Sequence, residues 1–173
     1  MKQIWLSSFL FVAVTTGGIV YGQNLNVSDQ KFVREAAEGG MAEVKLGQLA
    51  QDKGESQTVK DFGSRMVADH TKAGDQLKGI ASQKGMSVSN SLNAKDNALY
   101  NRLSKLSGRE FDREYMRAMV QDHVQDVAAF RKESTSGSDA EVRGFASNTL
   151  PTLQDHLKMA RDGLRSLGTS AAR

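Results

Sequence analysis

The residues best suited to chemistry are three histidines, each directly preceded by an aspartate: Asp69-His70, Asp122-His123 and Asp155-His156. At about 100° per residue, each imidazole falls on the apolar face of a predicted helix. Glu43 is placed in the same way on the apolar face of another predicted helix. All four groups lie near the middle of their helices, and mid-helix positions of an antiparallel bundle share one layer. One inward ionisable group from each of four helices is the geometry of a metal site in a bundle core.

Two interpretations of this layer follow from the residues. The first is a site for one transition-metal ion (iron, zinc, manganese or copper) with Glu43, His70, His123 and His156 as ligands. It requires the imidazoles to converge within about 4 Å of a common point, because metal–nitrogen bonds are about 2.0–2.1 Å long. The second is a buried hydrogen-bond network without metal, since an unpartnered buried polar group costs about 1–3 kcal/mol.

Other residues near the histidines have more ordinary predicted roles. Met66 and Met119 each precede a histidine by four residues, as Cu(I) ligands would, but core filling is the commoner role of methionine at this spacing. Asp69 and Asp155 fall toward the flanks of their apolar faces, where we expect surface charges rather than groups that orient an imidazole. No phosphate-binding glycine loop, nucleophile elbow or H-E-x-x-H motif occurs, so no catalytic residue is assigned and an enzyme is not expected.

The composition of the 173 residues indicates an all-α protein. There is one proline, aromatic residues make up 6%, and no strand-like alternating run is present. The absence of cysteine excludes disulfides, thiolate metal sites and a cysteine nucleophile. The 23 basic and 20 acidic residues are interspersed along the chain, which argues against a nucleic-acid-binding surface.

The N-terminus has the pattern of a secretory signal peptide. Lys2 precedes the apolar run 4–14, and small residues then lead to Gly22, where we place cleavage. The run is too short for a membrane span of roughly 20 residues, although an uncleaved N-terminal anchor is the alternative. We therefore expect a periplasmic or outer-membrane-associated protein, with no transmembrane segment in the mature chain and any envelope association peripheral.

The rest of the chain is predicted to form a single helical domain. Residues 23–27 are a linker, 28–168 the domain and 169–173 a disordered tail. Helical periodicity covers 29–52, 57–84, 109–132 and 140–167, with Ser28 as the first N-cap. Tight turns at 53–56 and 134–138 join these helices into two hairpins. The long segment 85–107, with a short helix over 94–106, connects the hairpins, and this is the connectivity of a ferritin-like four-helix bundle.

The two hairpins resemble each other in sequence. Residues 28–35 match 107–114 at Ser, Phe, Arg and Glu, and 59–64 match 142–147 at the same distance from a turn glycine. These matches indicate a duplicated hairpin. Aligning its two copies sets Asp122 opposite Glu43, which makes Asp122 a further metal-ligand candidate.

Helix-breaking residues give two more expectations. Gly39 and Gly40 lie inside the first predicted helix, where we expect them to allow close approach of a neighbouring helix. Pro151 lies inside the last helix, and we expect it to bend the helix there.

Several segments of the chain are similar to a known family. They are residues 32–50, 62–70, 106–112, 119–123 and 150–156. With them the chain resembles, over about 28–167, the secreted bacterial family catalogued as domain of unknown function 4142, whose members are often labelled outer membrane proteins. The resemblance implies a ferritin-like bundle and export, and it brings no established activity.

The ferritin-like pattern also sets an expectation for the metal. Di-iron members carry a Glu on two helices and Glu-x-x-His on the other two. Glu43 and Asp122 are placed like the first pair, and His70 and His156 like the two histidines. Val67 and Leu153 stand where the paired acids would be. We therefore expect a mononuclear site or a bundle without metal, rather than a di-iron oxidase.

Two functions follow as hypotheses. The first is a non-enzymatic, exported bundle protein with a binding or stress-related role in the cell envelope. The second is a metal-binding protein that uses the histidine layer. A convergence of the three imidazoles favours the second, whereas separate pairing of each imidazole favours the first.

Overall fold

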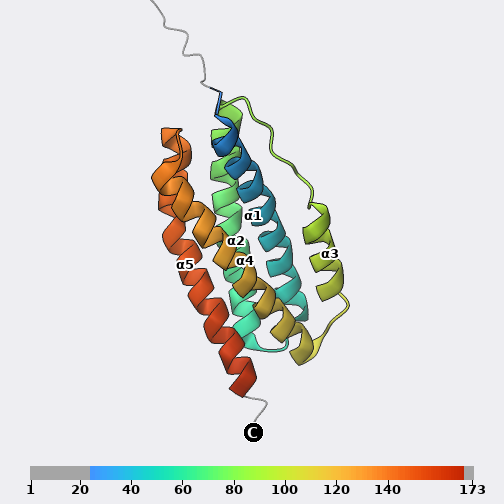
Figure 1. The fold of residues 1–173 in the computed structure, drawn as a ribbon. Helices are drawn as coiled ribbons and strands as arrows, with labels where there is room; N and C mark the ends of the chain where they lie inside the picture. Colours follow the sequence, from blue (N-terminus) through green and yellow to red (C-terminus); the bar gives the residue numbers. More distant parts are fainter. Residues whose placement is uncertain (1–23, 170–173) are drawn as a thin grey trace, which may run out of the picture.

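The computed structural model describes residues 24–169 (Figure 1). Within this range the chain forms five helices and no strand: α1 (Val27–Lys53), α2 (Gln57–Gln83), α3 (Ala94–Leu103), α4 (Gly108–Ser136) and α5 (Ala140–Thr169). The predicted all-α class is confirmed. The predicted signal peptide and residues 170–173 of the predicted tail lie outside the described residues.

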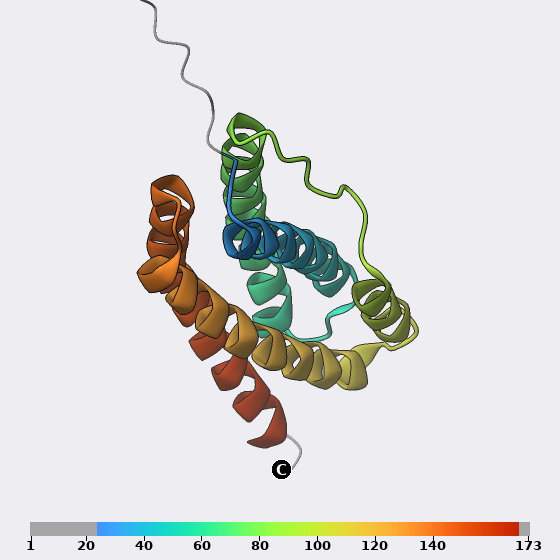
Figure 2. The same cartoon turned by 45° about the horizontal axis from the view of Figure 1, so that its top comes forward.

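The four long helices form an antiparallel bundle. α1 packs along α2 and α4 along α5, while the pairs α2–α5 and α1–α4 close the bundle. The crossover from α2 to α4 runs along the outside and carries α3, which lies against α1 and α4 (Figure 2). Two tight hairpins joined by one long crossover give the predicted ferritin-like connectivity.

Two buried aspartates tie each hairpin to the turn of the other. Both Asp29, in the first turn of α1, and Asp112, in α4, are 1% exposed. Asp29 accepts backbone N–H bonds from Ser138 and Asp139 in the α4–α5 turn. Asp112 accepts them from Glu55 and Ser56 in the α1–α2 turn, at 2.9 and 2.8 Å. Because a carboxylate satisfies the free N–H groups of a helix start, each bond fixes one hairpin against the other.

The start of α1 differs from the prediction. Asn26, not Ser28, is the N-cap, and its side-chain oxygen accepts the Asp29 N–H at 2.8 Å. The predicted linker 23–27 therefore includes the cap and Leu25, which is 5% exposed and belongs to the core. Cap choice depends on which side chain faces the free N–H groups, and sequence pattern alone did not separate two neighbouring candidates.

The core consists of two apolar clusters with a polar layer between them. One cluster lies toward the α1–α2 turn and includes Leu46, Phe62 and Tyr115. The other lies toward the α4–α5 turn and includes Val33 and Phe145. On α1, α2 and α4 the ionisable groups predicted to point inward fall between the residues of these clusters. The bundle thus surrounds a polar layer with apolar side chains on both sides.

The close crossing of α1 and α2 is made by glycines other than the predicted pair. A Cβ on Gly47 would lie 2.7 Å from the Gly63 carbonyl oxygen, and a Cβ on Gly63 would lie 2.7 Å from that of Gly47. At Gly39 a Cβ would meet nothing within 4 Å, and at Gly40 only His70, at 3.9 Å. The expectation that Gly39 and Gly40 allow a close helix approach was therefore wrong. The crossing point is set by how the two helices dock, which periodicity does not determine.

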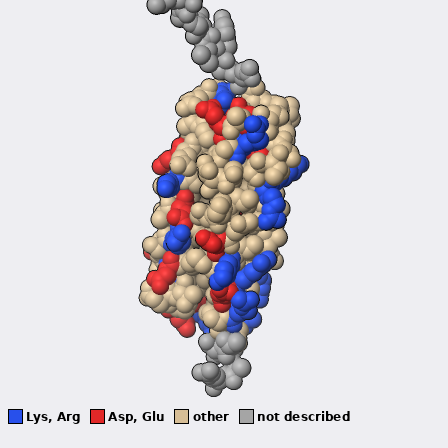
Figure 3. All heavy atoms as spheres, turned by 90° about the vertical axis from the view of Figure 1, so that its left-hand side faces the viewer, with Lys and Arg blue, Asp and Glu red and all other residues tan. Residues whose placement is uncertain are grey.

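The surface of the bundle carries charges of both signs. Figure 3 shows acidic and basic side chains along the whole length of the face that it presents. None of the helices within 24–169 is long and apolar enough to cross a membrane. α5 runs through Pro151 and continues on both sides of it, and the predicted bend there stays a prediction.

Candidate metal centre

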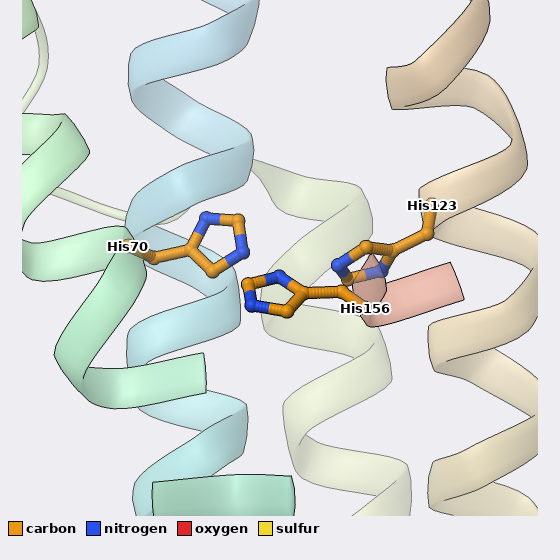
Figure 4. Close-up of side chains that lie close together, drawn as sticks. All are labelled: His70, His123 and His156. Atoms are coloured by element: carbon orange, nitrogen blue, oxygen red, sulfur yellow. The ribbon is translucent and has the colours of Figure 1, made fainter. Parts of the chain in front are cut away.

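Each of the four long helices brings one ionisable side chain into the polar layer. Glu43 comes from α1, His70 from α2, His123 from α4 and His156 from α5, and all four are buried. The imidazoles point toward one another (Figure 4), with ring centroids 5.3, 5.4 and 5.8 Å apart. One nitrogen from each ring lies within 4.8 Å of those from the other two. The structure therefore brings together the four residues that the sequence singled out.

The outer nitrogens of two histidines are held by acceptors. His123 Nδ1 lies 3.0 Å from the Met119 carbonyl oxygen one turn earlier on α4. Because a carbonyl only accepts, Nδ1 carries the proton and Nε2 holds the lone pair. His156 Nε2 lies 2.8 Å from Asp69 Oδ2 on α2. With Asp69 ionised, Nε2 donates this bond, and the lone pair of His156 lies on Nδ1.

The third histidine is oriented by the buried glutamate. His70 Nδ1 lies 2.8 Å from Glu43 Oε2, and both side chains are almost completely buried. When Glu43 is ionised, Nδ1 donates to it and the lone pair of His70 lies on Nε2. A nearby cation favours that state, because positive charge stabilises the carboxylate.

The remaining ring nitrogens have no hydrogen-bond partner among the described residues. They are His70 Nε2, His123 Nε2 and His156 Nδ1, the lone-pair atoms that the pairings above define. Each imidazole is thus fixed through one nitrogen and unpartnered at the other. Metal-binding histidines are oriented in this way, with the second nitrogen bonded to a carboxylate or a backbone carbonyl.

Burial keeps the imidazoles neutral. It lowers the pKa of His70 to about 4. Burial, with the neighbouring histidines His70 and His156, lowers the pKa of His123 to about 3. Burial also lowers the pKa of His156, although the Asp69 carboxylate opposes this shift. At neutral pH all three rings therefore carry a free lone pair, as metal coordination requires.

Glu43 and His123 face each other with two acceptor atoms. Glu43 Oε1 lies 3.3 Å from His123 Nε2, and neither atom has a hydrogen-bond partner. Two acceptors at this distance repel each other unless a proton or a cation lies between them. Burial, and after it the Asp122 carboxylate, raises the pKa of Glu43 well above its usual value. Either a proton or a metal ion between the two atoms would relieve this repulsion.

One carboxylate of the layer was missed by sequence reasoning. Ligand atoms of Glu43, His123 and Asp126 lie within 4.8 Å of one another. Burial, and after it the Glu43 carboxylate, raises the pKa of Asp126 to about 9. The duplicated hairpins contained a signal for Asp126, since Gly54 and Gly137 both cap a helix and the same spacing from each turn sets Asp126 opposite Glu43.

Asp122, the predicted further candidate, lies on the outer side of this group. It is half-buried and lines a pocket between α1, α3 and α4 together with Asp126. The clusters of potential ligands within the described residues contain Asp126 and not Asp122. Burial raises the pKa of Asp122.

Of the four residues beside the histidines, Asp69 differs from its prediction, and the other three lie as expected. Asp69 was predicted to be a surface charge, but it bonds to His156 and to Arg65. These two bonds outweigh burial and lower the pKa of Asp69. Asp155 is exposed, as predicted. Met66 and Met119 are fully buried in the apolar cluster toward the α1–α2 turn.

The donor set fits one metal ion better than two. Three imidazoles, two carboxylates and no thiolate suit iron, zinc, manganese or copper. A pair of adjacent ions requires more bridging carboxylates, and apolar Val67 and Leu153 stand at the positions where di-iron proteins carry them. Three nitrogens at bonding distance from a tetrahedral ion are roughly 3.4 Å apart, so nitrogens within 4.8 Å of one another must approach by at most about 1.4 Å.

Fold and site together define an antiparallel helical bundle with a buried histidine cluster at its centre. The chain belongs to the family described as domain of unknown function (DUF4142), whose model matches residues 21–162. No curated protein matches the chain. Among solved structures it is similar to the crystal structure of a DUF305 fragment from Deinococcus radiodurans, with a TM-score of 0.73 and 14% identity. That likeness covers 83% of this chain and 99% of the fragment, and it supports the fold alone.

Proposed function

We propose that this protein binds one transition-metal ion in the core of its bundle. The ligands are His70 Nε2, His123 Nε2 and His156 Nδ1, and Glu43 supplies a fourth ligand. The observation that carries the proposal is the common arrangement of the three buried imidazoles. Each is held at one nitrogen by a fixed acceptor and is unpartnered at the nitrogen that bears its lone pair. An unpartnered nitrogen in the protein interior costs about 1–3 kcal/mol, and a purely structural histidine gains nothing in return.

The charges of the layer favour a divalent ion. A buried dication needs compensating negative charge, since an unpaired charge in a protein interior is very unfavourable. Glu43 and Asp126 provide two carboxylates, and burial raises the pKa of each. The positive charge of the ion stabilises the ionised form of both groups, and two carboxylates balance the charge of a dication. Imidazole and carboxylate ligands suit iron, zinc, manganese and copper in the divalent state.

The proposed role is metal binding in the cell envelope rather than catalysis. The ligands are 0 to 6% exposed, and the cavity beside His70 and Glu43 has a volume of about 20 Å³. That is room for about one water molecule and not for an organic substrate. Export is part of the proposal and is supported by the signal-peptide pattern of residues 1–22.

The test is metal analysis of the protein purified without chelator from its native compartment. We expect close to one metal ion per chain in the natural protein and a loss of metal in His70→Gln and His156→Gln. Tyr115→Phe is the matched control, because it removes a buried hydroxyl that also lacks a hydrogen-bond partner but offers no lone pair to the cluster. Cu²⁺ or Co²⁺ spectra of the reloaded protein should show nitrogen ligands.

An absence of metal binding would contradict the proposal. If the natural protein holds no metal, and Zn²⁺, Cu²⁺, Mn²⁺ and Fe²⁺ all leave its melting temperature unchanged, the layer is a structural network. Lower stability of the histidine variants would then be their only effect. The search for function would move to protein partners in the envelope.

A further inference from the structure

We propose that metal reaches the histidine cluster from an acidic pocket between α1, α3 and α4, through an outer cation position made by Glu43, His123 and Asp126. This inference rests on the proposed function and adds to it a route and a second binding position. It concerns how fast the ion binds, whereas the proposed function concerns whether it binds.

The acidic pocket is the outer part of the route. It has a volume of about 300 Å³, and α1, the crossover, α3 and α4 all contribute to its lining. Its carboxylates are Glu35, Glu38, Asp96, Asp122 and Asp126, and Lys95 is the one cation in the lining. Such an excess of negative charge in a concave surface raises the local concentration of cations and their association rate.

Asp126 marks the boundary between this pocket and the interior. It lines the acidic pocket and also the small inner cavity, where His70 and Glu43 are its neighbours. Ala36 and Phe130 are likewise shared by the two linings. An ion that leaves the acidic pocket beside Asp126 therefore arrives next to Glu43 and His70.

Three unpartnered atoms form the outer position. Glu43 is 2% exposed and His123 is 0% exposed, and Glu43 Oε1, His123 Nε2 and Asp126 Oδ2 all lack a hydrogen-bond partner among the described residues. Ligand atoms of these three residues lie within 4.8 Å of one another. Buried polar atoms are normally paired, so three of them in one place indicate a site built for a cation.

His123 connects the outer position to the inner one. It belongs to both groups of ligands: Glu43, His123 and Asp126 in one, and His70, His123 and His156 in the other. An ion passing inward keeps His123, releases the Asp126 oxygen and binds the lone pairs of the other two imidazoles. The step is a ligand exchange, in which no electron is transferred and the charge of the ion is unchanged.

The opposite side of the bundle is less suited to cation uptake. A groove between α2 and α5 is lined by Asp69, Lys72 and Thr149. Its carboxylate is already engaged by Arg65 and His156, and Lys72 adds positive charge. The distribution of charge therefore favours cation uptake on the side of α1 and α4.

The route can be tested by the rate of Co²⁺ uptake into the metal-free protein, followed by stopped-flow absorbance of the nitrogen-bound ion. Gly39 lines the acidic pocket, and a Cβ there meets nothing within 4 Å. Gly39→Leu should fill the pocket and slow uptake by about tenfold or more, with the final Co²⁺ stoichiometry unchanged. Gly144→Leu is the matched control, because Gly144 is an equally open helical glycine on α5. The rate of Co²⁺ uptake by this variant should stay within about twofold of the natural rate.

Asp126→Asn gives a second, independent measurement. It should slow Co²⁺ uptake by about tenfold and weaken the dependence of the rate on salt concentration, since one steering charge is lost. Natural uptake rates in both Gly39→Leu and Asp126→Asn would overturn the route. Stoichiometric Co²⁺ at an unchanged rate contradicts the route alone. Failure of the natural protein to bind Co²⁺ contradicts the proposed function as well.

Discussion

His156 Nε2 on α5 lies 2.8 Å from Asp69 Oδ2 on α2, so the carboxylate that orients this imidazole comes from the neighbouring helix. Asp155, which precedes His156 in the sequence, is exposed. The three Asp-His pairs of the sequence are therefore not three equivalent units. Asp69 acts on the histidine of another helix, and through that bond it fixes which nitrogen of His156 faces the cluster.

Removal of this carboxylate should weaken metal binding without removing a ligand. Asp69→Ala is expected to lower the affinity for Zn²⁺ by about 10–100-fold, because His156 loses the group that sets its tautomer and orientation. The affinity can be measured by competition with a chromogenic chelator. Asp155→Ala changes the same charge next to the same histidine and should leave the affinity unchanged. Equal affinities for the two variants would contradict the assigned role of Asp69.

The crossing of α1 and α2 predicts opposite effects for two glycine substitutions. Gly63→Ala places a methyl group 2.7 Å from the Gly47 carbonyl oxygen and 2.8 Å from Ala50 Cβ, and it should cost about 1–3 kcal/mol of stability. Gly39→Ala meets no neighbouring atom and should stabilise α1 by about 0.5–1 kcal/mol. Urea unfolding of the two variants measures both. A stable Gly63→Ala protein would show that the helices can separate freely at this point.

The hydrogen bonds that Asp112 accepts from the α1–α2 turn predict a loss of stability when this carboxylate is removed. Asp112→Ala leaves the backbone N–H groups of Glu55 and Ser56 without their buried acceptor, which should cost about 1–3 kcal/mol. Asp112→Asn keeps one acceptor oxygen and should recover part of the loss. Asp75→Ala, an exposed change of the same charge on α2, serves as the control and should be nearly neutral in thermal unfolding. A loss as large in the control would mean that net charge, and not the buried acceptor, is responsible.

Glu133 predicts a pH-dependent effect away from the metal centre. It is 6% exposed, and its Oε1 lacks a partner among the described residues. Burial, and after it the Asp29 carboxylate, raises the pKa of Glu133 above its ordinary value of 4.5. A raised pKa means that the proton is bound more tightly in the folded state. The contribution of Glu133 to stability is therefore complete below pH 4.5 and is lost as the pH rises through the folded-state pKa.

Glu133→Gln should accordingly raise the melting temperature at pH 7 by roughly 2–4 °C. The difference from the natural protein should shrink toward pH 4, where Glu133 is protonated in both states. Glu110→Gln, at an exposed position in the first turn of α4, should give no stabilisation at either pH. A gain for Glu133→Gln that persists unchanged at pH 4 would point to packing rather than to ionisation.

The amino-acid sequence by itself determined the helices, their order and the inward face of each. Periodicity of apolar residues located four long helices to within four residues at each end, because burial selects one side of a helix wherever the bundle is closed. The two tight turns and the long crossover then restricted the topology to the observed one. The inward direction of Glu43, His70, His123 and His156 followed from the same periodicity.

Tertiary structure alone decided which residues meet across helices. The role of Asp69, the place of Asp126 beside Glu43 and the crossing at Gly47 and Gly63 all depend on the rotation and axial offset of one helix against another. Periodicity within a single helix carries no information on these quantities, since they are set by how the side chains of two helices interlock. For the same reason the sequence predicted a layer of ionisable groups, but the pairing of each imidazole nitrogen is visible only in the folded bundle.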